Sequence, residues 1–320
     1  MDGFHGTARN EGDAAAGDGL NAAEPDHLPQ RLWWVLAALT LAWGFNWTAL
    51  KVGLSEVPPW TFRSLCLWLG AAVLLVALRA GGQRLAPPTG QWGRLWLFAL
   101  LNITCWNMLV AFGVGMIPSG RAAILAYTMP VWAVPLSVWF LRERITGAKL
   151  LGLALGLGGL ALLLLESFVG LGRAPLGSLL VLGAAVTWAL GTVLQKRFPV
   201  SMPTGSYTVW IMLLGGAPIL VGAVLFEDWH ALKEVGVTAW LGTAYNVFIA
   251  FAFAHWAWIK IATSVPVSVF SISMLLIPVV GVVSGILFLG ERPSWAEYAS
   301  LALVLAALLT VLRPGRGARG

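Results

Sequence analysis

The sequence predicts an all-α integral membrane protein with ten transmembrane helices in two inverted five-helix repeats. Its composition is far from that of a soluble domain: 58% of the 320 residues are hydrophobic and only 11% are charged, where roughly 25% charged residues are typical of soluble proteins. The apolar residues form blocks of about twenty or more, the length that a helix needs to cross a bilayer core. The same pattern of blocks also recurs about 148 positions later.

Prolines and charged residues between the blocks mark this internal repeat. Four residues of the first half have an identical residue in the second half at one common shift, and a Trp/Lys pair of the first span recurs at a shift of about 145. The matched pairs are Pro118 and Pro266, Pro130 and Pro278, Glu143 and Glu291, Arg144 and Arg292, Trp43 and Trp188, and Lys51 and Lys196. A chance alignment of a few residues in a biased sequence is the alternative explanation.

Residues 1–31 differ from the rest of the chain. They are acidic and rich in Gly and Ala, so they cannot bury enough apolar surface to order themselves. They also lack the basic start and the separate apolar segment of a cleavable signal peptide. We therefore expect a disordered cytoplasmic tail.

The two repeats are expected to occupy residues 32–166 and 176–312. Turn and charge signals separate five spans in the first repeat: 33–54, 59–79, 92–115, 118–141 and 147–166. In the second repeat they separate 176–195, 204–226, 237–260, 263–289 and 294–312, which leaves residues 313–320 as a second cytoplasmic tail. Because the loops are short, neighbouring helices must be antiparallel. Since five is an odd number, the second repeat would enter the membrane in the opposite orientation.

The distribution of Lys and Arg predicts the orientation. With the N-terminus placed in the cytoplasm, fourteen of the 20 basic residues fall on or near the cytoplasmic side, as the positive-inside rule requires. Both termini are then cytoplasmic. Abundant Gly, Ala, Leu and Arg is typical of a protein from a GC-rich bacterial genome, so we expect the bacterial cytoplasmic (inner) membrane.

The composition also excludes several classes of protein. The net charge of +6 comes from basic residues scattered singly or in pairs at block ends, which predicts no nucleic-acid partner. Both cysteines, Cys66 and Cys105, lie inside apolar blocks, which disfavours a disulfide framework or a metal site. The glycines between 152 and 159 lack a preceding strand and a phosphate-binding Lys-Ser/Thr, so we expect no nucleotide, no cofactor and no direct ATP drive.

Three features together resemble the drug/metabolite transporter superfamily, specifically its EamA-type group. They are the Trp43-Gly44-Phe45-Asn46-Trp47 segment of the first span, the Arg142-Glu143-Arg144 and Gly290-Glu291-Arg292 junctions, and the doubled five-span layout. The resemblance covers roughly residues 32–312. It implies ten helices in two inverted repeats, cytoplasmic termini, and export or import of small metabolites such as amino acids, without fixing the substrate.

Glu143 and Glu291 each follow a long span and precede the last helix of a repeat. They could anchor or gate that helix. The alternative, which we favour, is a structural role in which each carboxylate pairs with the adjacent Arg144 or Arg292 and caps the next helix.

Arg63 and Lys51 lie close to span ends, where long side chains can extend to the lipid headgroups. Arg63 is the deeper of the two. A charge inside a span is also a candidate for the translocation path, where Arg63 would bind an anionic group.

His255 is the only histidine within a predicted span, and the repeat places it opposite Asn107. Two polar side chains at equivalent midplane positions are costly to bury unless they are partnered or face water. They could line the translocation path, or a hydrogen bond between helices could satisfy them. His255 could also titrate near neutral pH and couple protons to transport. No Asp or Glu lies in the middle of a predicted span, so the coupling ion stays open.

The ninth span carries Ser271 and Pro278 on one helical face, and the fourth span carries Tyr127 and Pro130 on the corresponding face. Small and hydroxylic residues along such a face permit close helix packing, or they leave room for cargo. Pro130 and Pro278 loosen the backbone hydrogen bonding, so each helix can bend there.

Trp43 and Asn46 of the first span and Trp188 of the sixth offer aromatic faces and one amide. Such a set suits a small amphipathic or aromatic ligand. It is equally compatible with core packing.

These observations predict a secondary transporter, not an enzyme, that moves a small organic metabolite such as an amino acid by alternating access of the two repeats. The alternative is a membrane-embedded lipid-modifying enzyme. That chemistry usually needs carboxylates or several histidines near the bilayer surface, and the loops offer no acidic cluster beyond Glu227 and Asp228. The expected partners are the metabolite and the lipid bilayer, and the oligomeric state is not predicted.

Overall fold

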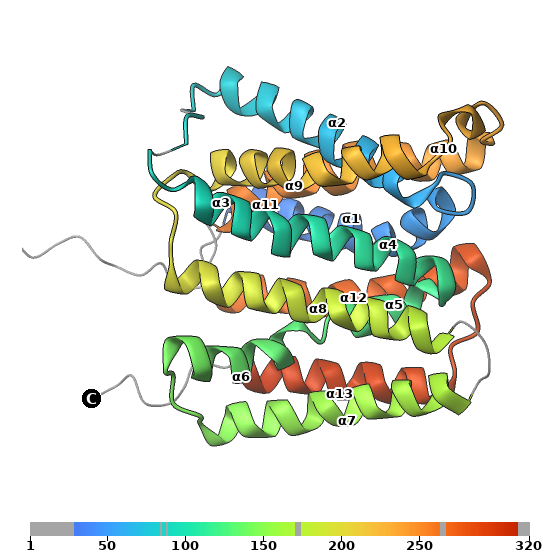
Figure 1. Ribbon diagram of the computed structural model, residues 1–320. Coiled ribbons are helices and arrows are strands. Elements are labelled where there is room, and N and C mark those ends of the chain that lie inside the picture. Colours follow the sequence, from blue (N-terminus) through green and yellow to red (C-terminus); the bar gives the residue numbers. More distant parts are fainter. Residues whose placement is uncertain (1–28, 84, 88, 170–173, 263–266, 313–320) are drawn as a thin grey trace, which may run out of the picture.

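The computed structural model describes residues 29–83, 85–87, 89–169, 174–262 and 267–312, and every regular element in them is helical (Figure 1). In the first half these are α1 (Gln30–Gly53), α2 (Pro59–Ala80), α3 (Trp92–Phe98), η2 (Ala99–Cys105), α4 (Trp106–Met116), α5 (Ser119–Ala126), α6 (Met129–Leu141) and α7 (Gly147–Val169). In the second half they are α8 (Ala174–Arg197), α9 (Thr204–Phe226), η3 (Trp229–Lys233), α10 (Val237–Ala244), η4 (Tyr245–Phe253), α11 (Ala254–Ala262), α12 (Val267–Leu289) and α13 (Trp295–Leu312).

Eight helical stretches of the described residues are long and apolar enough to cross a bilayer. They run over Gln30–Gly53, Pro59–Ala80, Trp92–Met116, Ser119–Leu141, Gly147–Val169, Pro175–Arg197, Thr204–Phe226 and Val237–Ile261. Two further apolar stretches, Met274–Leu289 and Trp295–Thr310, are shorter. The all-α membrane class is therefore confirmed, whereas the count of ten spans and the inverted repeats stay predictions.

The two halves of the chain interleave in one bundle of roughly aligned helices (Figure 1). The most extensive packing always joins a helix of the first half to one of the second: α7 with α13, α1 with α12, α2 with α9, and α4 with α8. The core between them is formed by buried aliphatic and aromatic side chains such as Phe62, Phe98, Leu125, Leu163 and Met212. Neither half therefore has a separate core of its own.

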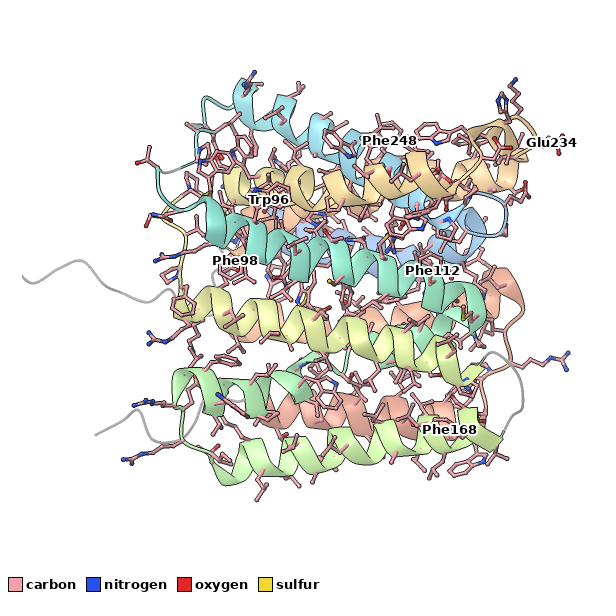
Figure 2. All side chains as sticks on the ribbon, in the orientation of Figure 1. Trp96, Phe98, Phe112, Phe168, Glu234 and Phe248 are labelled. Atoms are coloured by element: carbon pink, nitrogen blue, oxygen red, sulfur yellow. The ribbon has the colours of Figure 1, made fainter. Side chains whose placement is uncertain are left out.

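The outer surface of the bundle is apolar along its length and charged at its ends. Val76, Leu165 and Leu241 are all largely exposed on it. Figure 2 shows Phe248 along the side of the bundle and Glu234 at one end of it. Because an exposed aliphatic side chain forgoes about 1.5–3 kcal/mol of burial in water, this surface fits a hydrocarbon surrounding.

Two charged clusters identify the ends of the bundle. We call one the Glu291 end, because Glu291 there binds the start of α5. We call the other the Glu143 end, because Glu143 there binds Lys149 and Lys196. The orientation predicted from the basic residues would place the Glu291 end outside the cell and the Glu143 end in the cytoplasm.

A π-helix interrupts the third helical stretch of each half, and the sequence contains no signal for it. η2 covers Ala99–Cys105 and η4 covers Tyr245–Phe253, which are corresponding positions of the sequence repeat. π-Helical segments shift the hydrogen-bond pattern and are frequent at functional sites. Both segments make hydrogen bonds to other helices: a carbonyl of η4 accepts from Trp43, and side chains of η2 donate to α8 and α9.

The same left-handed turn ends α6 and α12. Arg142 and Gly290 occupy corresponding positions and have φ values of 55° and 64°. Behind them, the Glu143 N–H donates to the carbonyl of Ser137 (3.4 Å) and the Glu291 N–H donates to that of Gly285 (3.1 Å). Each of these hydrogen bonds closes a turn across the left-handed residue that ends the helix.

The fourth predicted span, 118–141, is not one helix. α5 ends at Ala126 and α6 begins at Met129, so the chain breaks at Tyr127 and Thr128. Pro130 lies in the first turn of α6, where its missing N–H costs nothing. Pro278 lies inside α12, which continues through it.

Candidate functional site

Trp43 of α1 reaches the π-helix η4. Its Nε1–H donates to the carbonyl of Ala250 (3.3 Å), and its ring lies 5.9 Å from that of His255 and 5.7 Å from that of Trp258. His255 also stacks on Phe251 at 5.5 Å, and its Nδ1 lies 3.1 Å from the same Ala250 oxygen. Because a carbonyl oxygen only accepts, Nδ1 carries the hydrogen, and Nε2 of the neutral ring is left as an acceptor.

Trp188 of α8 makes the corresponding contact with the π-helix η2. Asn102 Nδ2 donates to the carbonyl of Trp188 (3.1 Å), and the Trp188 and Trp106 rings lie 4.9 Å apart. Asn102 packs so closely on Gly191 that a side chain there would collide with its amide. Both predicted tryptophans therefore contact the π-helix of the opposite half of the chain.

Asn107 and His255 are not brought together by any described contact. Asn107 is only 2% exposed, and its Nδ2 donates to Ile103 of its own helical stretch (2.9 Å). The polar link between helices comes from Thr104, whose hydroxyl donates to the carbonyl of Gly215 in α9 (2.7 Å). Thus the hydrogen bond expected between helices is made by a neighbour of Asn107, and a role for Asn107 in a path stays a prediction.

Three asparagines carry buried oxygens without a partner among the described residues. They are Asn46 of α1, Asn102 of η2 and Asn246 of η4. Asn246 Nδ2 donates to Gly242 (3.0 Å), but its Oδ1 accepts nothing. α1 packs against η4. The sequence analysis missed Asn246, because the repeat places a phenylalanine, not a polar residue, opposite it.

The predicted residues of the fourth and ninth spans do not form a described polar site. Tyr127 is buried at the break between α5 and α6. Ser271 lies in α12, but its side chain lies outside the described residues. Bending at Pro130 and Pro278 therefore stays a prediction.

Lys51 and Arg63 both make contacts within the protein. Lys51 Nζ donates to the carbonyls of Val114 (2.6 Å) and Ile117 (2.7 Å), where it caps the end of α4. Arg63 is only 2% exposed, with its guanidinium carbon 5.6 Å from the centre of the Phe62 ring. Arg63 is therefore enclosed by protein.

The expected pairing of Glu143 with Arg144 is wrong. Its carboxylate accepts from Lys149 (2.8 Å) and from Lys196 (2.7 Å) at the far end of α8. These two hydrogen bonds, with the charges that make them, lower the pKa of Glu143 from 4.5 to about 2.

The expected pairing of Glu291 with Arg292, and its capping of the next helix, are also wrong. Its two oxygens accept from the backbone N–H groups of Ser119 (2.6 Å) and Gly120 (3.0 Å). Glu291 therefore caps α5, a helix of the first half. A carboxylate is favourable there because it meets free N–H groups and the positive end of the helix dipole.

Two other carboxylates cap helices at the same end. Glu227 accepts from Trp60 and Thr61 at the start of α2, and Glu56 accepts from Gly236 before α10. The partners lie 166 to 180 residues apart in the chain, so no local sequence pattern marks them. The one buried ion-pair network of the described residues joins Arg121 to Glu166 and Glu297, each at 2.6 Å.

The described residues contain no cluster of three or more His, Cys, Asp or Glu that could hold a metal. Cys66 and Cys105 are both free thiols. The polar groups of the interior are thus amides, hydroxyls, one imidazole, Arg63 and the ion-pair network of Arg121. Such groups can bind and orient a small molecule.

Comparison with known proteins gives a consistent family. The model of the EamA-like transporter family matches residues 32–165 and again residues 175–313. A crystal structure of another protein superposes with a TM-score of 0.62 at 22% identity, covering 88% of this chain and 96% of that one, which shows a shared fold.

Several curated proteins are similar along most of their length. The uncharacterized transporter YoaV of Bacillus subtilis is 26% identical over 275 residues, 86% of this chain and 92% of that protein. A probable amino-acid metabolite efflux pump of Escherichia coli is 28% identical over 287 residues, 86% and 92% of the two chains. The uncharacterized inner membrane transporter YedA of Escherichia coli is 26% identical over 290 residues, 88% and 90%.

Proposed function

The chain belongs to the EamA-like transporter family, and from this premise we propose that it is a secondary transporter of a small organic metabolite, working by alternating access in a bacterial inner membrane. It is a membrane transporter by family and by its apolar helices. The name of its Escherichia coli relative, an amino-acid metabolite efflux pump, makes an amino acid or a similar compound the first cargo to test. The family also disfavours the alternative of a lipid-modifying enzyme.

One observation carries the proposal of alternating access. Trp43 of the first half binds η4 of the second, and Trp188 of the second half binds η2 of the first. The two tryptophans correspond in the sequence repeat, and so do their partners Ala250 and Asn102. The hydrogen bonds run in opposite senses, since the Trp43 indole donates and the Trp188 carbonyl accepts, but they join corresponding segments of the two halves. A chain with two such related contacts can favour either of two arrangements, in which one contact is tight and the other is relaxed.

We assign the predicted site residues to the path between these contacts. Trp43, His255 and Asn46 would face the cargo from one side, and Trp188 and Asn107 from the other. Aromatic faces bind apolar parts of a small molecule while unpaired amides bind its polar groups. Tyr127 and Ser271 would lie along the same path, and Pro130 and Pro278 would let their helices bend.

Counterflow into proteoliposomes tests the proposal. Purified protein should exchange at least one compound of an amino-acid panel in a saturable manner. Trp43→Leu and Trp188→Leu should each lower that exchange at least tenfold, about 1.4 kcal/mol of barrier. Trp139→Leu is the matched control, because Trp139 is 82% exposed on the outer face of α6.

The two possible failures differ. No saturable exchange of any compound would refute a transporter of small metabolites of this kind. Exchange that persists after both tryptophans are replaced would support transport and show that the two tryptophan contacts are not needed for it.

A further inference from the structure

Arg63 is a buried cation without an anion. It lies in the second turn of α2 and is 2% exposed, so it contacts neither lipid headgroups nor bulk water. No ion pair or hydrogen bond joins its guanidinium to any residue that the structure describes, and its Nε is sealed from solvent without a partner. Arginine stays protonated in proteins, so the positive charge is present.

The other enclosed arginine, Arg121, does have anionic partners. Arg121 is bound by two carboxylates, Glu166 and Glu297, each at 2.6 Å. Near Arg63, the acid at the start of α2 is Glu227, and both of its oxygens are held by the N–H groups of Trp60 (2.9 Å) and Thr61 (2.7 Å). The missing anion is therefore specific to Arg63.

The contact with Phe62 does not replace a counter-ion. The guanidinium carbon lies 5.6 Å from the ring centre, close to the limit of a cation–π interaction, which returns less free energy than burying an unpaired ion costs. In membrane proteins, an ionisable residue inside a span marks the site of a ligand or an ion by default.

A second unpaired polar group lies on the helix that packs against α2. η4 packs against α2 and carries the free Oδ1 of Asn246. The buried hydroxyls of Thr61 and Ser64 are also unpaired, but residues one or two positions from Arg63 on a helix do not share its face. A fixed positive charge on one helix and an amide acceptor on its neighbour are groups that bind a carboxylate with an adjacent polar substituent.

We propose that Arg63 binds the carboxylate of the transported compound, so that the cargo is a small carboxylic acid or amino acid and not a neutral solute or an amine. The planar guanidinium offers parallel N–H groups that match both carboxylate oxygens. The carboxylate of the cargo supplies the negative charge that no described residue supplies to Arg63. This inference rests on the proposed transport function and names the class of its substrate.

The test compares acids with their amides on the same protein. L-Leucine, L-phenylalanine and L-threonine, and the amide of each, are offered to the purified wild type. Counterflow is measured in proteoliposomes, and the unfolding temperature is measured in detergent. We expect at least one acid to raise the unfolding temperature and to exchange at least about tenfold faster than its amide, because losing a hydrogen-bonded charge leaves Arg63 unpaired again.

Variants connect this difference to Arg63. Arg63→Met should abolish both the temperature shift and the preference for the acid, and Arg63→Lys, which keeps the charge but not the planar fork, should retain part of each. Arg79→Met is the matched control, since Arg79 lies on α2 and is exposed. If Arg63→Met does not fold, the comparison of acid with amide on the wild type and on Arg63→Lys tests whether Arg63 binds the carboxylate.

Each outcome is decisive. Equal exchange of acid and amide, or exchange and stabilisation by amides alone, overturns the carboxylate site and leaves the transporter standing. Acids that stabilise the wild type but not Arg63→Met, without exchange of any compound, support the site and refute the transporter. If none of the acids stabilises or exchanges, the carboxylate site is wrong.

Discussion

The imidazole of His255 is held in one tautomer by the π-helix beside it. Its Nδ1–H is directed at the carbonyl of Ala250 (3.1 Å), which also accepts from Trp43. Nε2 is left as the proton-accepting atom, against the rings of Trp43 and Phe251. A ring held in this way can gain and lose one proton at one defined atom.

We predict that His255 makes transport pH-dependent. The wild-type exchange rate should change between about pH 5 and pH 8, the range in which histidine titrates. His255→Gln, which keeps a hydrogen-bonding side chain, should flatten that profile. Trp256→Leu is the control, because Trp256 is adjacent in the chain and exposed. A wild-type rate that does not vary with pH would show that protonation of His255 is not coupled to transport.

Glu143 provides a prediction for stability at low pH. Its pKa is about 2 in the folded protein because Lys149 and Lys196 bind it, against 4.5 ordinarily. A lowered pKa means that the stabilisation is complete above about 4.5 and is lost as the pH falls towards 2. Glu143→Gln should lower the free energy of unfolding by about 0.2–1 kcal/mol at pH 7, and the deficit should shrink below pH 4.5.

Chemical denaturation in detergent at several pH values measures this difference. A deficit that stays constant from pH 7 to pH 3 would show that the two lysines do not stabilise the ionised carboxylate.

At the scale of elements, Glu291 joins the loop before α13 to the start of α5, and so joins the two halves of the chain. Its counterpart Glu143 is bound to two lysines at the opposite end of the bundle. The two ends are thus held by chemically different contacts although the sequence repeat makes the glutamates equivalent.

We predict that Glu291→Ala loosens the Glu291 end. Losing a helix cap costs about 1 kcal/mol, and the effect should be local, because only the N–H groups of Ser119 and Gly120 lose their acceptor. Hydrogen exchange of the first turn of α5 should accelerate about fivefold or more. Glu234→Ala, an exposed residue at the same end, should leave it unchanged. Unaltered exchange in Glu291→Ala would contradict the capping role.

The helical stretches could be predicted from the sequence, whereas their irregularities could not. Hydropathy and the prolines at 58, 59 and 203 determine where helices begin, because proline fits the start of a helix and an apolar block must cross the bilayer as helix. The break at Tyr127 and Thr128 has one local signal, Pro130, which cannot donate to the carbonyl of Ala126. Proline alone does not determine a break, however, since α12 continues through the corresponding Pro278. The π-helices η2 and η4 have no signal in the local sequence pattern.

The site was predictable only in part, for a similar reason. The repeat identified Trp43, Trp188 and His255 as candidates, and Arg63 was identified by its depth inside a span. Glu143 and Glu291, however, were assigned to their neighbours in sequence. Glu143 binds Lys149, 6 residues away, and Lys196, 53 residues away, and Glu291 binds Ser119, 172 residues away. Charge pairing across a bundle depends on which helix ends meet, and the sequence pattern reports only the residues that are adjacent along the chain.

At the scale of the whole molecule, the central claim is that the two ends of the bundle open in turn. The packing supports it, since α1, α2, α4 and α7 each lie against a helix of the other half. A relative movement of the halves must therefore change both ends. If the movement is a rocking about the middle, one end widens as the other narrows.

Paired spin labels measure this most directly. With Cys66 and Cys105 replaced by alanine, one label pair at exposed Ser55 and Leu176 reports on the Glu291 end, and another at exposed Gly81 and Phe198 reports on the Glu143 end. We predict that adding an exchanged amino acid lengthens one inter-label distance and shortens the other. Distances that both stay constant during active exchange, or that lengthen together, would contradict alternating access.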